Sequence, residues 1–290
     1  SRNVPSVKTL YLAGIDDTVA LARKMGITTL REEPPYGLAL VLGGAEVRLV
    51  DIVSAYGVFG NNGVRNPWTL IQRIELGDGS VLEEKVDTSE RVLDEQVARL
   101  VNNVLSDNNA RAPVFGANSP LYFPGRDVAA KTGTTQDNRD AWVIGYTPNL
   151  AVGVWTGNNN NTSMTRAGAG ISASGPMWHE FTALALNKLP RVSFGPPNPV
   201  SINKVMLNGS YIFNNQAHTI LYYVDRNNPR GAVPSNPAAD PQFPNWEWSV
   251  QNNFRLVVPE PSQTPIETPS PGTSPMPIGI PFPVLPDMNL

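Results

Sequence analysis

Apolar residues recur at helical spacing through much of the first half of the chain. The clearest case is Asp94–Leu105, and its buried side is expected to carry Val97, Leu100, Val101, Val104 and Leu105. Glu46–Phe59 shows a similar pattern and is followed by Gly60-Asn61-Asn62-Gly63, which should end the helix. These patterns predict two helices separated by a different kind of segment.

Shorter signals fill the rest of this half. Thr18–Met25 is predicted to be helical, because Asp16 and Asp17 are placed to cap it and Gly26 to end it. Leu70–Leu76 and Ser80–Val86 flank a Gly-Asp-Gly turn and therefore predict a β-hairpin.

The pattern changes in the middle of the chain. Val128–Thr134, Ala141–Tyr146 and Ala151–Thr156 are apolar or β-prone runs, and Thr147-Pro148-Asn149 forms a turn between the last two. A helix follows, with Pro176 in its first turn and with Met177, Phe181 and Leu184 on one face. Three strands and then a helix predict an antiparallel sheet flanked by helices, an α/β (α+β) fold.

Three regions are distinguished by composition. Residues 1–190 hold the predicted helices and sheet, and residues 191–258 form a small irregular or β extension in which Tyr211–Phe213 and Ile220–Val224 are candidate strands. Residues 259–290 form a low-complexity tail with ten prolines between Pro259 and Pro286. Such a tail buries too little apolar surface to fold, so it is expected to be extended or disordered.

Composition excludes several classes of function. The net charge is −3 with no basic cluster, which does not fit nucleic-acid binding. The absence of cysteine excludes disulfides, cysteine nucleophiles and Cys-liganded zinc, and two histidines are too few for a His-rich metal site. No metal or other cofactor is therefore expected. No apolar run approaches the roughly 18 residues of a membrane span.

Lys131-Thr132-Gly133 is the segment that points to chemistry. On a strand edge, backbone groups can pair with an extended peptide, and Gly133 has no side chain to block that approach. Lys131 would supply a positive charge, and the hydroxyls of Thr132 and Thr134 could bind a carboxylate. The tripeptide alone is weak evidence, because about one chain in thirty of this size would contain it by chance.

The surrounding sequence is more specific. Residues 128–135, 140–148 and 152–158 strongly resemble the class A (bifunctional) penicillin-binding proteins, and Ser1–Lys8 resembles the Ser-x-Asn motif and following helix of that family. The resemblance covers roughly residues 1–190. It implies the serine β-lactamase and D,D-peptidase-like fold, which would be incomplete at its N-terminus here.

The resemblance also implies an activity and its residues. The family transfers an acyl group from the D-Ala-D-Ala end of a peptidoglycan stem peptide to a serine and then to an amine, and β-lactams mimic that substrate. Ser1, Asn3 and Lys131 would be catalytic, and Thr132, Gly133, Thr134 and Thr135 would bind substrate, with the backbone N–H of Thr134 in the oxyanion hole. The expected location is the extracytoplasmic face of the bacterial cell membrane, with a glycosyltransferase domain and the membrane anchor preceding this chain.

Two decoys compete with these assignments. Ser106-Asp107-Asn108 also fits Ser-x-Asn, but it follows a predicted helix end and is interpreted as a helix-terminal turn. Ser201-Ile202-Asn203-Lys204 is the one match to the nucleophile motif Ser-x-x-Lys. It follows Lys-Thr-Gly, which reverses the family order, and nearby prolines disfavour the helix that the motif needs.

The nucleophile is therefore expected upstream of Ser1, and the isolated chain is expected to be inactive. Three alternatives stay open: a D,D-carboxypeptidase, a serine β-lactamase, or a non-catalytic penicillin-sensing or wall-binding domain. His179, Trp142 and Trp155 are interpreted as packed residues, and Asp140 as a turn anchor.

Overall fold

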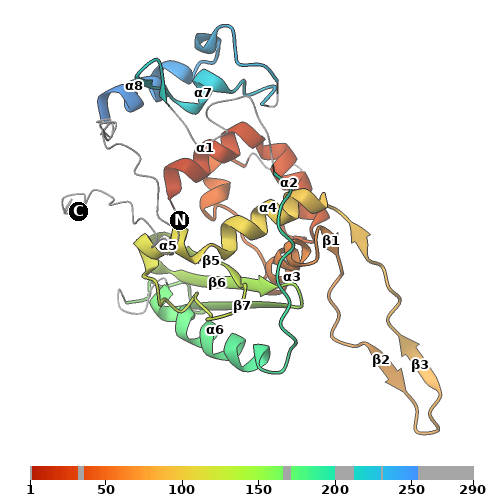
Figure 1. Cartoon of the computed structure of the whole chain (residues 1–290). Coiled ribbons are helices and arrows are strands. Elements are labelled where there is room, and N and C mark those ends of the chain that lie inside the picture. The colour runs from red at the N-terminus through yellow and green to blue at the C-terminus, as the bar shows by residue number, and fades with distance from the viewer. Residues whose placement is uncertain (1, 32–35, 166–170, 200–211, 230, 254–290) are drawn as a thin grey trace, which may run out of the picture.

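A three-stranded antiparallel sheet is the centre of the computed structural model, which describes residues 2–31, 36–165, 171–199, 212–229 and 231–253. Strands β5 (Ala129–Thr134), β6 (Asp140–Thr147) and β7 (Leu150–Gly157) lie in that order. Lys131 pairs with Ile144 and Gly133 with Trp142 across the first ladder, and Val143 pairs with Val154 across the second. The three strands and their antiparallel arrangement confirm the predicted sheet (Figure 1).

Helix α6 (Ile171–Leu186) covers one face of this sheet. Trp178 is fully buried there, packs with Ala130, Val143 and Val152, and donates from Nε1 to the Val152 carbonyl at 3.0 Å. Gly145 lies beneath that ring, and a Cβ at this position would overlap it. A large aromatic side chain of α6 and a glycine of β6 thus fit together on this face.

Helices α3 (Leu49–Gly60) and α4 (Glu95–Ser106) cover the opposite face. Asn102 joins the layers, because its side chain donates to the Phe59 carbonyl at 2.9 Å and accepts from the Tyr146 hydroxyl at 2.8 Å. Asp94 caps α4 by accepting from the Gln96 and Val97 N–H groups. Burial raises the pKa of Tyr146 far above its usual value, which keeps the phenol neutral.

The predicted buried side of α4 is confirmed only in part, because Val101 and Leu105 are half-buried but the other predicted residues are not. Its buried residues are Ala98 and Asn102, whereas Val97 and Leu100 are partly exposed and Val104 is 71% exposed. The helix is turned so that Asn102 reaches Phe59 and Tyr146. A buried amide with both hydrogen bonds made is compatible with the core, and it sets the direction of the helix here.

Two helices precede these elements. Helix α1 (Asn3–Ala13) ends at Gly14, whose φ of 87° lies in the left-handed region, and α2 (Ile15–Lys24) begins at once. The predicted capping of α2 by Asp16 and Asp17 is wrong, because both lie in its first turn and Gly14 is the N-cap. They still favour the helix there through its dipole. The short helix η1 (Leu38–Leu42) packs against α1.

The remaining elements are small. Strands β2 (Arg73–Glu75) and β3 (Val81–Glu84) form the predicted hairpin, which extends away from the rest of the structure (Figure 1). At its base, β1 (Val64–Arg65) pairs with β4 (Glu90–Arg91). Helix α5 (Asn108–Phe115) follows α4, and the 3-10 helix η2 (Gln136–Asn138) joins β5 to β6.

The extension after Pro190 contains a folded part. It consists of β8 (Ile212–Phe213), β9 (Gln216–Ala217), α7 (Ile220–Tyr223), η5 (Pro237–Ala239) and α8 (Phe243–Asn253). The predicted strand Ile220–Val224 is instead α7, because the Thr219 hydroxyl accepts from Leu221 N–H and caps a helical turn. Tyr211 and residues 254–290, including the Pro-rich tail, lie outside the described residues.

A stripe of exposed apolar side chains runs along the outer side of α6. Met177, Phe181 and Leu184 are 58%, 58% and 61% exposed. On the same side of the sheet Val152 is buried and Val154 half-buried. Within the described sheet, the outer backbone edge of β7 has no neighbouring strand.

We predict that replacing Phe181 and Leu184 together by serine increases the soluble fraction of the isolated 290-residue chain. The reason is that exposed apolar stripes and strand edges promote association. Leu70→Ser is the matched control, because Leu70 is 90% exposed and lies far from α6 in the sequence. Soluble yield and light scattering measure the effect. Equal aggregation of the double variant and the control would show that the stripe is not responsible.

Candidate active site

Strand β5 presents the Lys-Thr-Gly segment on the outer edge of the described sheet, because β6 is its only partner among the described strands. The Lys131 side chain is half-buried, and its Nζ donates to the Thr132 carbonyl at 2.6 Å. Burial lowers the pKa of this ammonium from its ordinary value, because the charged form is less well solvated. The site thus holds a cation beside a strand edge that can pair with an extended ligand.

The direction of each side chain follows from strand alternation. Lys131 and Gly133 share the face of Ile144 and Trp142, opposite the face that packs on α6. A Cβ on Gly133 would lie 3.5 Å from Trp142 Cβ, an ordinary contact, so packing does not require glycine here. Thr132 and Thr134 alternate to the other face. A ligand that used these hydroxyls together with Lys131 would have to lie along the strand edge.

The end of β5 is tied to the start of β6 by the side chain of Asp140. Thr135 Oγ1 donates to Asp140 Oδ2 at 2.9 Å and accepts from Asp140 N–H at 2.9 Å. Trp155 Nε1 of β7 donates to Asp140 Oδ1 at 2.8 Å. Asp140 is therefore a turn anchor, as predicted. The Thr135 hydroxyl keeps one acceptor lone pair for a substrate, because its hydrogen and its other lone pair are used.

The other predicted site residues begin the chain. Asn3 is exposed and is the first residue of α1, and Ser1 lies outside the described residues. Helix α1 packs on η1, and Gly43, directly after η1, lies against Thr135: a Cβ on Gly43 would be 4.0 Å from Thr135 Cγ2. The turn after η1 thus links α1 to the end of β5. If Ser1, Asn3 and Lys131 serve one reacting centre, as the resemblance implies, their side chains are predicted to lie within about 10 Å of one another.

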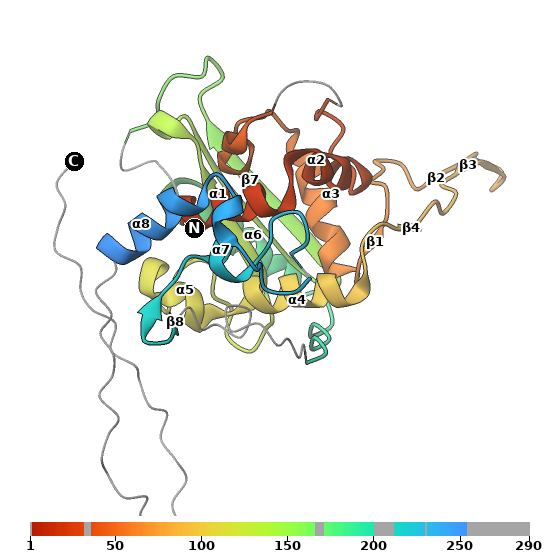
Figure 2. The same cartoon turned by 90° about the horizontal axis from the view of Figure 1, so that it is seen from above.

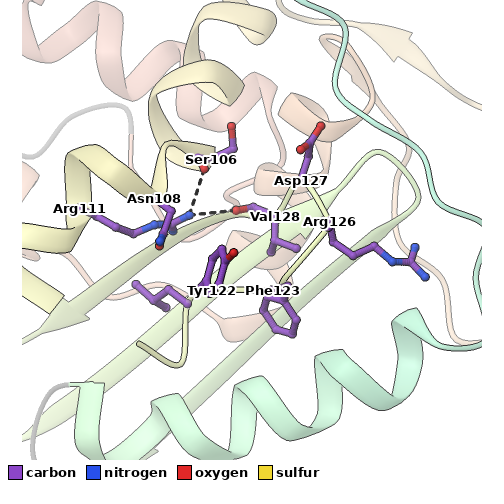
Figure 3. A pocket seen from close by; sticks show the side chains of 10 residues that line it. Ser106, Asn108, Arg111, Tyr122, Phe123, Arg126, Asp127 and Val128 are labelled. Atoms are coloured by element: carbon purple, nitrogen blue, oxygen red, sulfur yellow. Dashed lines mark hydrogen bonds between the residues drawn. The ribbon is translucent and has the colours of Figure 1, made fainter. Parts of the chain in front are cut away.

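The first decoy is a structural turn, as predicted. Asp107 accepts from Ala110 N–H and caps α5, and Asn108 donates to the Ala117 carbonyl at 2.9 Å. Arg111 then joins the Ser106 and Val128 carbonyls, at 3.2 and 3.3 Å (Figure 3). This cluster lies at the start of β5. The second decoy, Ser201–Lys204, lies outside the described residues.

A cavity of about 220 Å³ lies beside this turn, between α5 and the segment that leads into β5 (Figure 3). Arg111 and Asn108 face it from one side and Tyr122 and Phe123 from the other. It contains none of the predicted site residues.

The remaining candidates are packed, as predicted. His179 Nδ1 lies 2.8 Å from the Pro120 carbonyl, and its ring stacks on Phe123. Trp142 and Trp155 lie with their ring centroids 6.4 Å apart. Within the described residues there is no group of three or more His, Cys, Asp or Glu side chains that could hold a metal ion. In the same part of the chain, no helix has the length and apolar character needed to cross a membrane.

Comparison with known proteins identifies the family to which this chain belongs. The sequence profile of the penicillin binding protein transpeptidase domain matches residues 37–182. Penicillin-binding protein 2D of Bacillus subtilis is 32% identical over 206 residues, which cover 69% of this chain and 29% of that protein. Penicillin-binding protein 1A of Aquifex aeolicus is also 32% identical, over 70% of this chain and 27% of its own length.

A solved structure agrees with both sequence comparisons. PonA1 of Mycobacterium tuberculosis in complex with penicillin V superposes with a TM-score of 0.55 at 28% identity, over 65% of this chain and 54% of that one. The fold is that of the serine acyl-transferases, which confirms the predicted fold class. The chain belongs to the penicillin-binding protein transpeptidase family, and it spans less than a third of the length of the two relatives.

We predict that Asp140→Ala destabilises the protein by about 1–3 kcal/mol, because it leaves the half-buried Trp155 Nε1–H and the Thr135 hydroxyl without their shared acceptor. Trp155→Phe removes one donor and keeps the Thr135 bond, so its effect should be smaller. Urea unfolding of the full-length protein measures both. Equal stability of Asp140→Ala and the parent would show that the hydrogen bonds to Asp140 contribute nothing to the free energy of unfolding.

We predict that Gly133→Ala leaves the fold intact and, under the function proposed below, slows acylation of the full-length protein by β-lactams. The methyl group meets Trp142 at an ordinary distance, but it projects from the face of β5 that carries Lys131. Ala130→Gly, a change of the same size in the same strand but on the α6 face, is the control. Thermal unfolding and acylation rate separate the two effects. An unchanged acylation rate in Gly133→Ala would mean that ligands do not approach this face.

Proposed function

We propose that this chain supplies the Lys-Thr-Gly strand and the Ser-x-Asn motif of a D,D-transpeptidase that cross-links peptidoglycan. The observation that carries the proposal is the position of Lys131, half-buried on an edge strand and on the same face as Gly133. An edge strand can pair with the extended end of a stem peptide, while the cation attracts its terminal carboxylate.

The proposed reaction has two acyl transfers. A serine oxygen forms a bond to the carbonyl carbon of the penultimate D-Ala, the C–N bond breaks, and the terminal D-Ala leaves with the proton of the serine hydroxyl. The amine of a second stem peptide then takes the acyl group and returns a proton to the serine. The negative oxygen formed in each step would accept from the backbone N–H of Thr134 and from that of the nucleophile.

Each residue has a role in this proposal. Lys131 orients the carboxylate of the substrate, and its lowered pKa makes its charge more sensitive to alkaline pH than that of an exposed lysine. Ser1 passes protons, and Asn3 holds the substrate amide. Thr132, Gly133 and Thr135 align the bound peptide along β5. β-lactams are proposed as ligands of the same edge, as suggested by the penicillin V complex of PonA1.

The nucleophile is proposed to belong to a Ser-x-x-Lys segment outside these 290 residues, because the one match within them, at Ser201, follows Lys-Thr-Gly. The whole protein is proposed to work at the extracytoplasmic face of the bacterial cell membrane, with a glycosyltransferase domain and an anchor elsewhere in the polypeptide. The class A relative penicillin-binding protein 1A, of which this chain spans 27%, supports that proposal.

Labelling with a fluorescent penicillin tests the proposal. We expect the full-length protein to form a covalent adduct, Lys131→Met to slow its formation by roughly 100-fold or more, and the isolated chain to form none. Lys188→Met is the matched control, since Lys188 is exposed beyond the end of α6. Ser201→Ala should label normally. Loss of the adduct in Ser201→Ala would reassign the nucleophile and overturn the proposal.

The molecule that finally accepts the acyl group distinguishes a transpeptidase from the alternative functions. A transpeptidase forms a new amide when a stem-peptide donor is mixed with an amine acceptor, whereas a carboxypeptidase or β-lactamase yields only hydrolysed product. A sensing domain keeps the acyl group. Mass spectrometry of the products separates these outcomes.

A further inference from the structure

The folded part of the extension, residues 212–253 without Arg230, is here called the C-terminal cap. Its helices α7 and α8 lie over α1 in both views of the structure, although about 200 positions separate α1 from the cap in the sequence (Figures 1 and 2). None of the predicted site residues lies in the cap, and the match to the transpeptidase domain ends at residue 182. The cap therefore contacts α1 from outside both the predicted site and the matched domain.

Within the cap, hydrogen bonds to Glu247 and stacking of the His218 ring hold α7 and α8 together. Glu247 is buried, lies 2.7 Å from His218 Nδ1 through Oε1, and accepts from Thr219 N–H at 3.1 Å through Oε2. The His218 ring stacks on Tyr222 with centroids 3.8 Å apart. A buried carboxylate with these partners fixes the start of α7 against α8.

Tyr11 of α1 is the centre of the contact with the cap. Its hydroxyl donates to the Asp240 carboxylate at 3.2 Å, its ring lies 5.4 Å from the Trp246 ring, and the Arg226 guanidinium sits 4.1 Å above it. Arg226 Nε also donates to the Tyr11 carbonyl at 3.3 Å. Burial, and then the Asp240 charge, raise the pKa of Tyr11, so the phenol stays a donor at neutral pH.

A second residue of α1 extends the contact by one turn. Lys8 lies three positions before Tyr11 and therefore on the same side of the helix. Its Nζ is 4.6 Å from the centroid of Trp246. Trp246 thus touches α1 at two successive turns, an arrangement that resists both rotation and tilting of the helix.

Helix α1 needs such support because of how it is built. It ends at Gly14, where left-handed backbone separates it from α2, and its N-cap residue Arg2 makes no side-chain capping bond. Asn3 and Tyr11 are eight residues apart, or about 12 Å along the helix. A tilt of about 10° around the Tyr11 end would therefore move Asn3 by roughly 2 Å. A displacement of about 1 Å at a reacting centre is enough to slow a reaction 100-fold.

We infer that the C-terminal cap holds α1 in the orientation that keeps the Ser-x-Asn end of the helix in register with Lys131, and that Tyr11, Arg226, Asp240 and Trp246 are positioning residues for acyl transfer. The inference rests on the proposed function. It assigns the cap a role in the rate of acylation, exerted through α1 and without any contact between the cap and the substrate.

The test compares two tryptophans of one helix in the full-length protein. Trp246→Ala removes the contact with Lys8 and Tyr11, and Trp248→Ala removes a side chain that is 62% exposed. Stopped-flow acylation by a fluorescent penicillin separates the binding constant from the acylation rate constant. We expect Trp246→Ala to lower the rate constant roughly 10- to 100-fold with little change in binding. Trp248→Ala should match the parent, and Trp246→Phe should recover most of the rate.

A second measurement separates positioning from stability and from the proposed function. Hydrogen exchange should accelerate in Asn3–Ala13 of Trp246→Ala while the thermal transition of the sheet is retained. A normal acylation rate in folded Trp246→Ala would overturn the inference, as would unchanged exchange in α1. If the parent itself is not acylated, the proposed function fails, and exchange alone then decides whether the cap orders α1.

Discussion

The pairing of β5 with β6 is the interaction on which the arrangement of the site depends, because that ladder sets the direction of every side chain in the Lys-Thr-Gly segment. A shift of one residue would exchange the faces of Lys131 and Thr132 and place the ammonium among the residues under α6. The register is fixed at both ends. Gly145 must lie under Trp178, and Asp140 must reach both Thr135 and Trp155. Residues outside the Lys-Thr-Gly segment therefore determine the position of the cation.

One end of β5 belongs to the buried core, whereas the other end must stay accessible for a ligand to bind. Ala129 and Ala130 are buried, as expected for a strand between helical layers, whereas Thr134 is exposed. Burial therefore decreases along the strand toward the end that would bind a ligand. Lys131 lies where the change occurs, so its stem is packed and its pKa is lowered while its Nζ still reaches a backbone carbonyl at the next residue. A partly desolvated cation interacts more strongly with a carboxylate than an exposed one would.

Local patterns predicted the parts of this fold whose cause is local. The three strands, the hairpin and helices α3 and α4 are set by period, turn residues and caps, and the Lys-Thr-Gly segment is contiguous in the sequence. The exposed face of α4 was mispredicted because a polar residue, Asn102, directs the helix through partners 43 and 44 positions away. The strand predicted at Ile220–Val224 failed for a related reason. Its aromatic and β-branched residues favour a strand, but the Thr219 cap and the packing around His218 produce a helical turn.

The orientation of α1 cannot be predicted from a short sequence motif. Ser-x-Asn names residues at one end of a helix, but the direction of a helix is set by what packs along its length. Here η1 packs against α1, and the cap contacts Tyr11 and Lys8 of the same helix. Neither partner is recognisable as part of the site from sequence, because η1 approaches the end of β5 through Gly43 and Thr135, which are far apart in the chain, and the cap belongs to a region whose composition suggests irregular structure. A segment outside the matched domain can thus act on a motif through the element that carries it.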